Sequence, residues 1–441
     1  MTQNTVPFRD ALGYWWKLGL TSFGGPAGQI SMLHDEVVVK RRWISEKRFL
    51  HALNYCVVLP GPEAQQLVTY MGWLMHGVRG GVVAGTLFVL PSLVILIALS
   101  GLYMAWGTTP LVAGIFAAVK PIVVAIIAQA VFRIGGRSLK HPVMWGLAAL
   151  STVLMLVSGS LFPVILVVAV VIGLVGARVA PAIFADASKH GDAEHGPLPA
   201  VIDDDTPPPP HARITRWRLV RTVLASAAAW FLPVGALWAT LGAESPFVVM
   251  ALFFSGAAFL TFGGAYSVLP FVFHGAVTNG WATPSQMVDG LALGETTPGP
   301  LIMIVSFVGF IGGYVGEFLG TGTSWVSGIL AATIATWFTF LPSFFFIIGG
   351  GPYVEATRGK ASFTAPLAAV NAAVVGVVMS LAITFASNVF LPAEQPINWF
   401  GIALAIAAAV ALFRFKRSIM QVIAASALIG LVSGVATLLA N

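Results

Sequence analysis

The sequence predicts an all-α protein that crosses a membrane many times and is built from an inverted internal repeat. Three observations predict this fold. Hydrophobic residues make up 57% of the 441 residues and charged residues only 9%, against about 45–50% and 25% in soluble proteins. Thirteen long apolar segments follow one another along the chain. The same glycine and proline motifs occur in both halves, in the same order.

The thirteen apolar segments divide into groups of six, one and six. They are residues 11–32, 49–76, 82–106, 111–132, 143–159 and 161–177, then 219–241, then 247–273, 287–315, 325–348, 363–389, 399–413 and 419–439. About 20 apolar residues are needed for a helix to span a bilayer. Because one extra crossing separates two sets of six, the second set enters from the opposite side, and the repeat is predicted to be inverted.

Glycine, proline and tryptophan identify the repeat. Phe23-Gly24-Gly25-Pro26 matches Phe262-Gly263-Gly264-Ala265 at an offset of 239, and Pro60-Gly61-Pro62 matches Pro298-Gly299-Pro300 at an offset of 238. Further matches join Trp43 to Trp281, Gly72-Trp73 to Gly309-Phe310, Leu90-Pro91-Ser92 to Leu341-Pro342-Ser343 and Val119-Lys120 to Val370-Asn371. We therefore divide the chain into a first repeat (1–181), a linker (182–218), a connecting helix (219–245) and a second repeat (246–441).

The linker is rich in charge and proline, which indicates a solvated segment with no core. The basic residues of the later loops all fall on one side of the predicted membrane, which the positive-inside rule makes cytoplasmic. The N-terminus and the linker are then cytoplasmic and the C-terminus periplasmic, in a bacterial inner membrane.

One basic loop, Lys40 to Arg48, fits this topology only if segments 11–32 and 49–76 each enter, break and return. The mirrored loop, residues 274–286, contains no Lys or Arg and would face outside. We therefore expect about nine spanning helices and four broken or re-entrant hairpins. Ordinary spans with kinks are the alternative.

The breaks predict an anion site. Proline ends one helix and can start another, and broken backbone at membrane depth is tolerated only around protein or a cavity. Paired breaks in two repeats are typical of transporter binding sites, and helix starts bind anions through free N–H groups. For a single glycine, close helix packing is an equally good interpretation. The predicted oxyanion-binding residues are Phe23, Gly24, Gly25, Pro26, Gln29, Pro60, Gly61, Pro62, Glu63, Gln65, Gln66, Phe262, Gly263, Gly264, Thr297, Pro298, Gly299 and Pro300.

Charged residues within the apolar segments are further candidates, because they are costly in lipid. Lys120 could act as a counter-charge for an anion, with Asn371 in the mirrored place, or could instead reach an interface or pair with a carboxylate. Glu63 and Glu295 are candidates for proton binding, since burial favours a neutral carboxyl group. Asp289 lies nearer a segment end and is expected to be solvated.

No enzyme motif, metal site or cofactor site is predicted. The sequence has no H-E-x-x-H, no C-x-x-C and no Walker loop, and its one cysteine, Cys56, cannot form an internal disulfide. A membrane-embedded enzyme that uses Glu63 or Glu295 is disfavoured because no nucleophile or metal cluster accompanies them.

The two Phe-Gly-Gly motifs, the Pro60 to Gln66 block and the Thr297 to Pro300 block closely resemble the long-chain, two-domain members of the chromate ion transporter family. The resemblance covers nearly the whole chain except the linker. It implies chromate efflux across the bacterial inner membrane, chromate resistance, and sulfate as a competing oxyanion. The second half departs at Ala265 and lacks the Glu-Ala-Gln-Gln tail, so equal roles for the two halves are not expected.

The alternatives within transport are import of sulfate or a related oxyanion, and a passive anion channel. The expected partners are the oxyanion and the lipid bilayer, with no nucleic acid. The sequence leaves the coupling ion and the oligomeric state open, a homodimer included.

Overall fold

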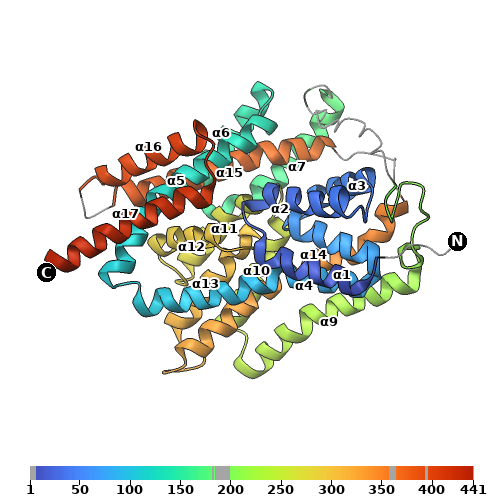
Figure 1. The fold of residues 1–441 in the computed structure, drawn as a ribbon, viewed down its shortest axis with the longest axis horizontal. Helices are drawn as coiled ribbons and strands as arrows, with labels where there is room; N and C mark the ends of the chain where they lie inside the picture. The colour runs from blue at the N-terminus through green and yellow to red at the C-terminus, as the bar shows by residue number, and fades with distance from the viewer. Residues whose placement is uncertain (1–5, 181–182, 184–198, 357–363, 393–395, 441) are drawn as a thin grey trace.

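A computed structural model of the chain describes residues 6–180, 183, 199–356, 364–392 and 396–440. Within these ranges the secondary structure is helical, and extended pairing is limited to one bridge between Ile44 and Ile202. The molecule is elongated, with the N-terminus at one end and the C-terminus at the other (Figure 1). The predicted all-α architecture is confirmed.

The first half contains two broken helix pairs followed by long helices. Its elements are α1 (Phe8–Thr21), α2 (Gly25–His34), the π-helical η1 (Asp35–Lys40), α3 (Glu46–Val58), α4 (Glu63–Trp106), α5 (Pro110–Ser138), α6 (Pro142–Val157), η2 (Gly159–Leu161) and α7 (Phe162–Val179). After the linker, η3 (Pro210–Ala212) leads into α9 (Arg216–Leu241).

The second half repeats this order. Its elements are α10 (Pro246–Leu260), α11 (Ala265–Thr278), α12 (Pro284–Thr296), η4 (Leu301–Met303), α13 (Ile304–Gly316), α14 (Ser324–Ala356), α15 (Thr364–Phe390), α16 (Trp399–Phe413) and α17 (Ile419–Ala440). The helix α4 is broken internally, because His76 (φ −134°) and Gly77 (φ 65°) have non-helical backbone. Residues 63–75 therefore correspond to α13, and residues 78–106 to α14.

The helices that flank the predicted breaks are too short to cross a membrane alone. They contain 10 to 15 residues, which is about 15–22 Å at 1.5 Å per residue. The hydrocarbon core of a bilayer is about 30 Å thick. Each such helix therefore needs a second helix beyond the break, as the proline and glycine motifs predict, and the direction of the second helix decides whether the pair spans or returns.

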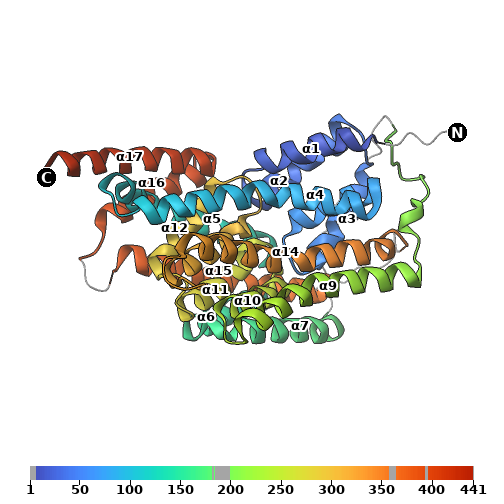
Figure 2. The same cartoon turned by 90° about the horizontal axis from the view of Figure 1, so that it is seen from below.

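Each broken pair begins and ends at the same end of the molecule. In the first half, His76 Nε2 lies 2.8 Å from the Val6 carbonyl, so the end of the second pair lies beside the start of the first. Trp43, in the loop between the two pairs, lies with its ring 5.9 Å from that of Tyr14 in α1, so this loop is near the same end. In the second half, the Phe247 and Phe318 rings lie 5.2 Å apart and join the start of α10 to the end of α13. In both views α3 lies toward the N-terminal end and α12 toward the C-terminal end (Figures 1 and 2). The two sets of hairpins therefore point in opposite directions.

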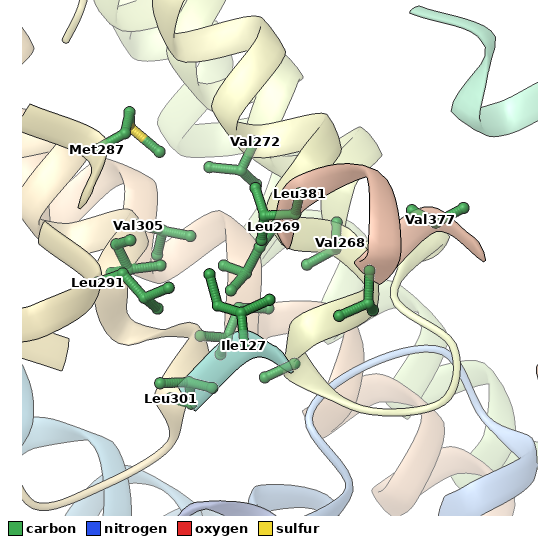
Figure 3. Close-up of a cluster of buried hydrophobic side chains, with 14 of the residues drawn as sticks. Ile127, Val268, Leu269, Val272, Met287, Leu291, Leu301, Val305, Val377 and Leu381 are labelled. Carbon is green, nitrogen blue, oxygen red and sulfur yellow. The ribbon is translucent and has the colours of Figure 1, made fainter. Parts of the chain in front are cut away.

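The remaining helices supply the expected spanning elements. Seven helices of the described residues are long and apolar enough to cross a membrane, and α6 and α16 are shorter apolar helices of 16 and 15 residues. These helices enclose the second-half hairpins, where Ile127 of α5 meets Leu269 of α11, Leu291 of α12 and Leu381 of α15 (Figure 3). Lipid tails are as apolar as these side chains, so close van der Waals packing is what holds this core together.

The described part of the linker docks against the basic loop of the first half. The Val201 and Ile202 N–H groups donate to the Arg42 and Trp43 carbonyls, both at 2.9 Å. The Arg48 guanidinium donates to the Thr206 carbonyl. Of residues 199–212 only Ala212 is buried, which agrees with the prediction of a segment without a core, but the docking of this segment against the loop after η1 was not predicted. Residues 184–198 lie outside the described residues.

Candidate functional site

The Pro-Gly-Pro breaks of the two halves meet, and each is completed by the other half. The Gly61 N–H donates to the Thr261 carbonyl at 2.7 Å, and the Gly299 N–H donates to the Ser22 carbonyl at 2.8 Å. Ser22 and Thr261 directly precede the two Phe-Gly-Gly motifs. Four breaks that are far apart in sequence therefore share one crossing point at the centre of the protein.

The same exchange extends to the Leu-Pro-Ser repeat. A Cβ atom placed on Gly61 would lie 2.5 Å from Ser343 Oγ, and one on Gly299 would lie 2.8 Å from Ser92 Cβ. Both glycines have positive φ, +127° and +103°. Each break thus needs glycine for its backbone conformation and for the close approach of a serine from the opposite half.

Two predicted glutamines stabilise the crossing. Gln29 Nε2 donates to the Gly299 carbonyl at 2.5 Å and to the Ser22 carbonyl at 3.3 Å. Gln66 Nε2 donates to the Pro60 carbonyl at 2.7 Å and to Ser343 Oγ at 3.4 Å. Gln65 has a local role, since its Nε2 donates to Thr69 Oγ1 one turn later at 3.0 Å. Gln29 and Gln66 therefore occupy carbonyl oxygens that the broken helices leave without partners.

The Phe-Gly-Gly turns border open space. A Cβ atom on Gly24, Gly25 or Gly264 would meet no atom within 4 Å, and all three residues have positive φ. Helices α2 and α11 begin at these turns, and α4 and η4 begin at the Pro-Gly-Pro breaks. None of these four described helix starts has a hydrogen bond from a capping side chain. Free N–H groups and the positive ends of four helices are thus directed toward the crossing.

Several buried polar atoms around the crossing have no hydrogen-bond partner among the described residues. They are the hydroxyl oxygens of Ser22 and Ser92 and the amide oxygens of Gln29, Gln65 and Gln66. Such atoms are costly to bury unless a ligand or water satisfies them. The hydroxyl groups are donors that suit an oxyanion, and the amide oxygens are acceptors that suit a water molecule or a protonated oxyanion.

Each of the two glutamates lies next to a Pro-Gly-Pro break in the sequence. Tyr266 of α11 donates its hydroxyl to Glu295 Oε1, inside the second-half hairpins. Glu63 is the first residue of α4, directly after its break. Burial is the main influence on the charge state of both carboxylates, and the exposed arginines of α5, Arg137 for Glu63 and Arg133 for Glu295, are a lesser one.

Lys120 is not brought to the crossing. Its Nζ lies 3.3 Å from Asp289 Oδ2 and donates to Ser285 Oγ at 2.6 Å. Tyr103 donates to the same carboxylate at 2.8 Å. Asp289 is seven residues before the end of α12, which is about 10 Å along the helix. The expectation that Asp289 is solvated is wrong, since the residue is only 2% exposed.

The mirrored residue behaves differently. Asn371 of α15 lies beside the second Phe-Gly-Gly turn, and a Cβ atom on Gly263 would be 3.1 Å from Asn371 Oδ1. Lys120 and Asn371 occupy mirrored positions in the repeat but therefore have different neighbours in the two halves. This agrees with the expectation that the halves contribute unequally.

Sequence reasoning missed two features of the site. Ser92 and Ser343 were recognised as part of the repeat but not as neighbours of the breaks, although a polar residue repeated next to proline was a usable signal. The partnership of Lys120 with Asp289 joins positions 169 residues apart. Nothing in the local sequence of either residue indicates the other.

The fold and the crossing define a polytopic membrane transporter with an inverted repeat and paired broken helices. A sequence profile of the chromate transporter family matches residues 10–177 and 248–431, so both repeats are covered. The chain belongs to the chromate transporter family.

Relatives of the chain include two that are named chromate transport proteins. It is 33% identical over 422 residues to the chromate transport protein of Pseudomonas aeruginosa, covering 94% of this chain and 89% of that protein. It is 26% identical over 435 residues to the chromate transport protein of Cupriavidus metallidurans, covering 98% and 94%. An uncharacterized transporter of Methanocaldococcus jannaschii is 25% identical over 371 residues, covering 84% and 82%. No solved structure matches the chain.

Proposed function

We propose that the chain is a secondary transporter that moves chromate out of the cell across the bacterial inner membrane and so confers chromate resistance. The observation that carries this proposal is the reciprocal bonding of the breaks, Gly61 N–H to the Thr261 carbonyl and Gly299 N–H to the Ser22 carbonyl. It gathers four uncapped helix starts at one point. Membership of the chromate transporter family supplies the class of substrate.

The crossing suits a tetrahedral dianion because it offers many donors and few full charges. A dianion leaves water only if fixed donors replace its hydration shell. The Gly61 and Gly299 N–H groups are already used within the protein, so we assign the donor role to the free N–H groups of the four helix starts and to the Ser22 and Ser92 hydroxyls. Positive helix ends supply charge without burying four cations.

Transport requires access from each side in turn. The first-half hairpins open toward the end of the molecule that contains the linker, and the second-half hairpins open toward the other end. Two backbone hydrogen bonds join the sets at the crossing. We propose that a shift of one set against the other exposes the anion alternately, in the way that inverted-repeat transporters rock around a fixed site.

Glu63 and Glu295 are the proposed proton carriers. Both are next to a break, and each interacts electrostatically with one arginine of α5. Binding of a proton to either carboxylate removes a negative charge near the dianion and so favours its entry. Lys120 of α5 and Asp289 of α12 lie away from the crossing, where these two helices meet. We place this pair on the route between the crossing and the periplasm.

The proposed topology keeps the N-terminus and the linker cytoplasmic. It is supported by Ser45 Oγ, which donates to Asp204 Oδ1 at 2.6 Å and so holds the basic loop against the linker. The mirrored loop follows His274, which packs beside Gly159 in η2, at the opposite end of α7 from the linker. These contacts support a topology in which the basic and the uncharged loop lie on opposite sides, as the positive-inside rule expects.

The test is chromate uptake into inside-out vesicles, with and without an imposed proton gradient and with sulfate as competitor. We expect uptake above that of vesicles lacking the protein, a response to the gradient, and partial inhibition by excess sulfate. Glu63→Gln and Glu295→Gln should reduce the response to the gradient. Glu244→Gln, which changes an exposed glutamate before α10, is the matched control and should behave as the wild type.

Each alternative has its own outcome. Uptake that does not respond to the gradient in the wild type would show a passive channel. Sulfate uptake that chromate does not inhibit would show a sulfate transporter. A normal response to the gradient in both glutamate variants would contradict the assignment of the proton carriers.

A further inference from the structure

A large cavity lies between the connecting helix α9 and helices α4 and α14. The cavity measures about 830 Å³ and is partly open to the outside. The Trp337 indole N–H donates to the Ala229 carbonyl at 3.1 Å and joins α14 to α9. Val82 and Leu93 line the α4 wall, and Phe340 and Phe344 line the α14 wall. A wall of this kind suits a hydrocarbon chain and not a hydrated oxyanion.

One end of this cavity is strongly basic. Arg213, Arg218 and Arg221 line it where the linker passes into α9. Arg218 donates to the Pro210 carbonyl at 2.5 Å, which fixes its position at the rim. In the part of the chain that the structure describes, none of the three forms an ion pair. Three guanidinium groups thus lie above an apolar cavity without an acidic partner.

The position of these arginines is electrostatically unfavourable in the protein alone. The first turn of α9 contains no acidic residue. Cations near a helix start oppose the positive end of the helix dipole, and each such placement is unfavourable. An anion bound at this end would be attracted both by the arginine side chains and by the positive end of the helix dipole. A guanidinium group is well shaped to bind phosphate oxygens in pairs.

We propose that the cavity between α4, α9 and α14 binds one anionic phospholipid. Its phosphate group contacts Arg213, Arg218 and Arg221, and an acyl chain lies between α9 and α14. Basic pockets between membrane helices on the cytoplasmic side are typical sites for acidic head groups. The lipid fills the gap between the connecting helix and the first repeat, and so links the two halves on the side where α9 has few protein neighbours.

The test uses the purified full chain in a neutral detergent and native mass spectrometry with added phosphatidylglycerol or phosphatidylcholine. We expect phosphatidylglycerol to be retained at least about tenfold more than phosphatidylcholine, given the attraction of an anionic lipid to each nearby cation. The triple variant R213Q/R218Q/R221Q should lose that preference. The control K140Q/R414Q/K416Q removes three exposed cations elsewhere and should keep it.

A second variant tests the apolar part independently of charge. Ala225 lines the cavity, and Ala225→Trp should fill the space and reduce retention of phosphatidylglycerol by several fold while all three arginines remain. If the triple variant does not fold, this variant and the single change Arg221→Gln decide the question. Equal retention of both lipids, or unchanged retention in Ala225→Trp, would overturn the proposal. Displacement of the lipid by millimolar inorganic phosphate would show a free phosphate site instead.

Discussion

The substitution Gly299→Ala tests whether the close crossing of the two halves is essential. Gly299 has φ +103°, and a Cβ atom there would lie 2.8 Å from Ser92 Cβ and 3.1 Å from Ser92 Oγ. The position of Ser92 Cβ is fixed by the backbone of α4, so this atom cannot rotate away, although Oγ can. At Gly61 the obstacles are Gln66 Nε2 and Ser343 Oγ, both at 2.5 Å and both at the ends of side chains. We therefore expect Gly299→Ala to be the more damaging of the two.

The magnitude follows from two separate effects. A left-handed backbone conformation costs an alanine about 1–2 kcal/mol. An extra carbon in a tightly packed place costs about 1–3 kcal/mol. Gly299→Ala should therefore lower the free energy of unfolding by about 2–5 kcal/mol, and adding Ser92→Gly should recover the packing part and leave the backbone part. Transport should fall in the single variant because the proposed anion site shares this crossing.

The measurement is equilibrium unfolding in mixed micelles, combined with chromate uptake by vesicles at matched protein levels. Gly146→Ala is the control, since Gly146 is a helical residue of α6 with no atom within 4 Å of the added Cβ. That change should be neutral or stabilise the protein by up to about 1 kcal/mol. If Gly299→Ala unfolds like the wild type, or if Ser92→Gly recovers nothing, the tight crossing is not what holds the halves together.

Two further predictions concern other parts of the chain. Lys120→Met leaves the buried Asp289 carboxylate without its cation and should destabilise the protein by about 3–5 kcal/mol. The double variant Lys120→Met/Asp289→Asn should recover most of that loss in the same unfolding assay. If the effects of the two single changes simply add in the double variant, the two residues do not form a direct pair. In a background with Cys56→Ser, a cysteine replacing Lys47 should react with an impermeant reagent only from the cytoplasm and one replacing Thr278 only from outside, and labelling of both from one side would remove the inverted arrangement.

The sequence predicted the broken hairpins well, because proline and glycine act locally. The prolines on both sides of Gly61 and Gly299 end a helix, and glycine allows the positive φ that both residues have. The apolar segments themselves are long enough to span, and the basic loop from Lys40 to Arg48 was the signal that favoured hairpins over kinked spans. The inverted order of the two repeats followed from counting segments, which depends on hydrophobicity alone.

The partners across the crossing could not be predicted in the same way. The hydrogen bond from Gly61 to Thr261 joins residues 200 positions apart, and no local property of either residue specifies it. The pairing of Lys120 with Asp289 depends on how α5 lies against α12. The docking of the linker was missed because backbone hydrogen bonds, such as that from Ile202 to Trp43, leave no trace in composition. Tertiary geometry decides each of these contacts.

The reciprocal bonds at the crossing also limit how such a protein can be divided. Each repeat supplies a donor glycine to the other and accepts one in return, through the Ser22 and Thr261 carbonyls. A polypeptide consisting of one repeat would leave both groups unsatisfied inside the membrane, where lost backbone hydrogen bonds are most costly. Such a polypeptide could complete its site only if its copies inserted into the membrane in both orientations and formed antiparallel dimers. Fusing two copies through a single extra crossing helix such as α9 fixes that antiparallel partnership within one chain.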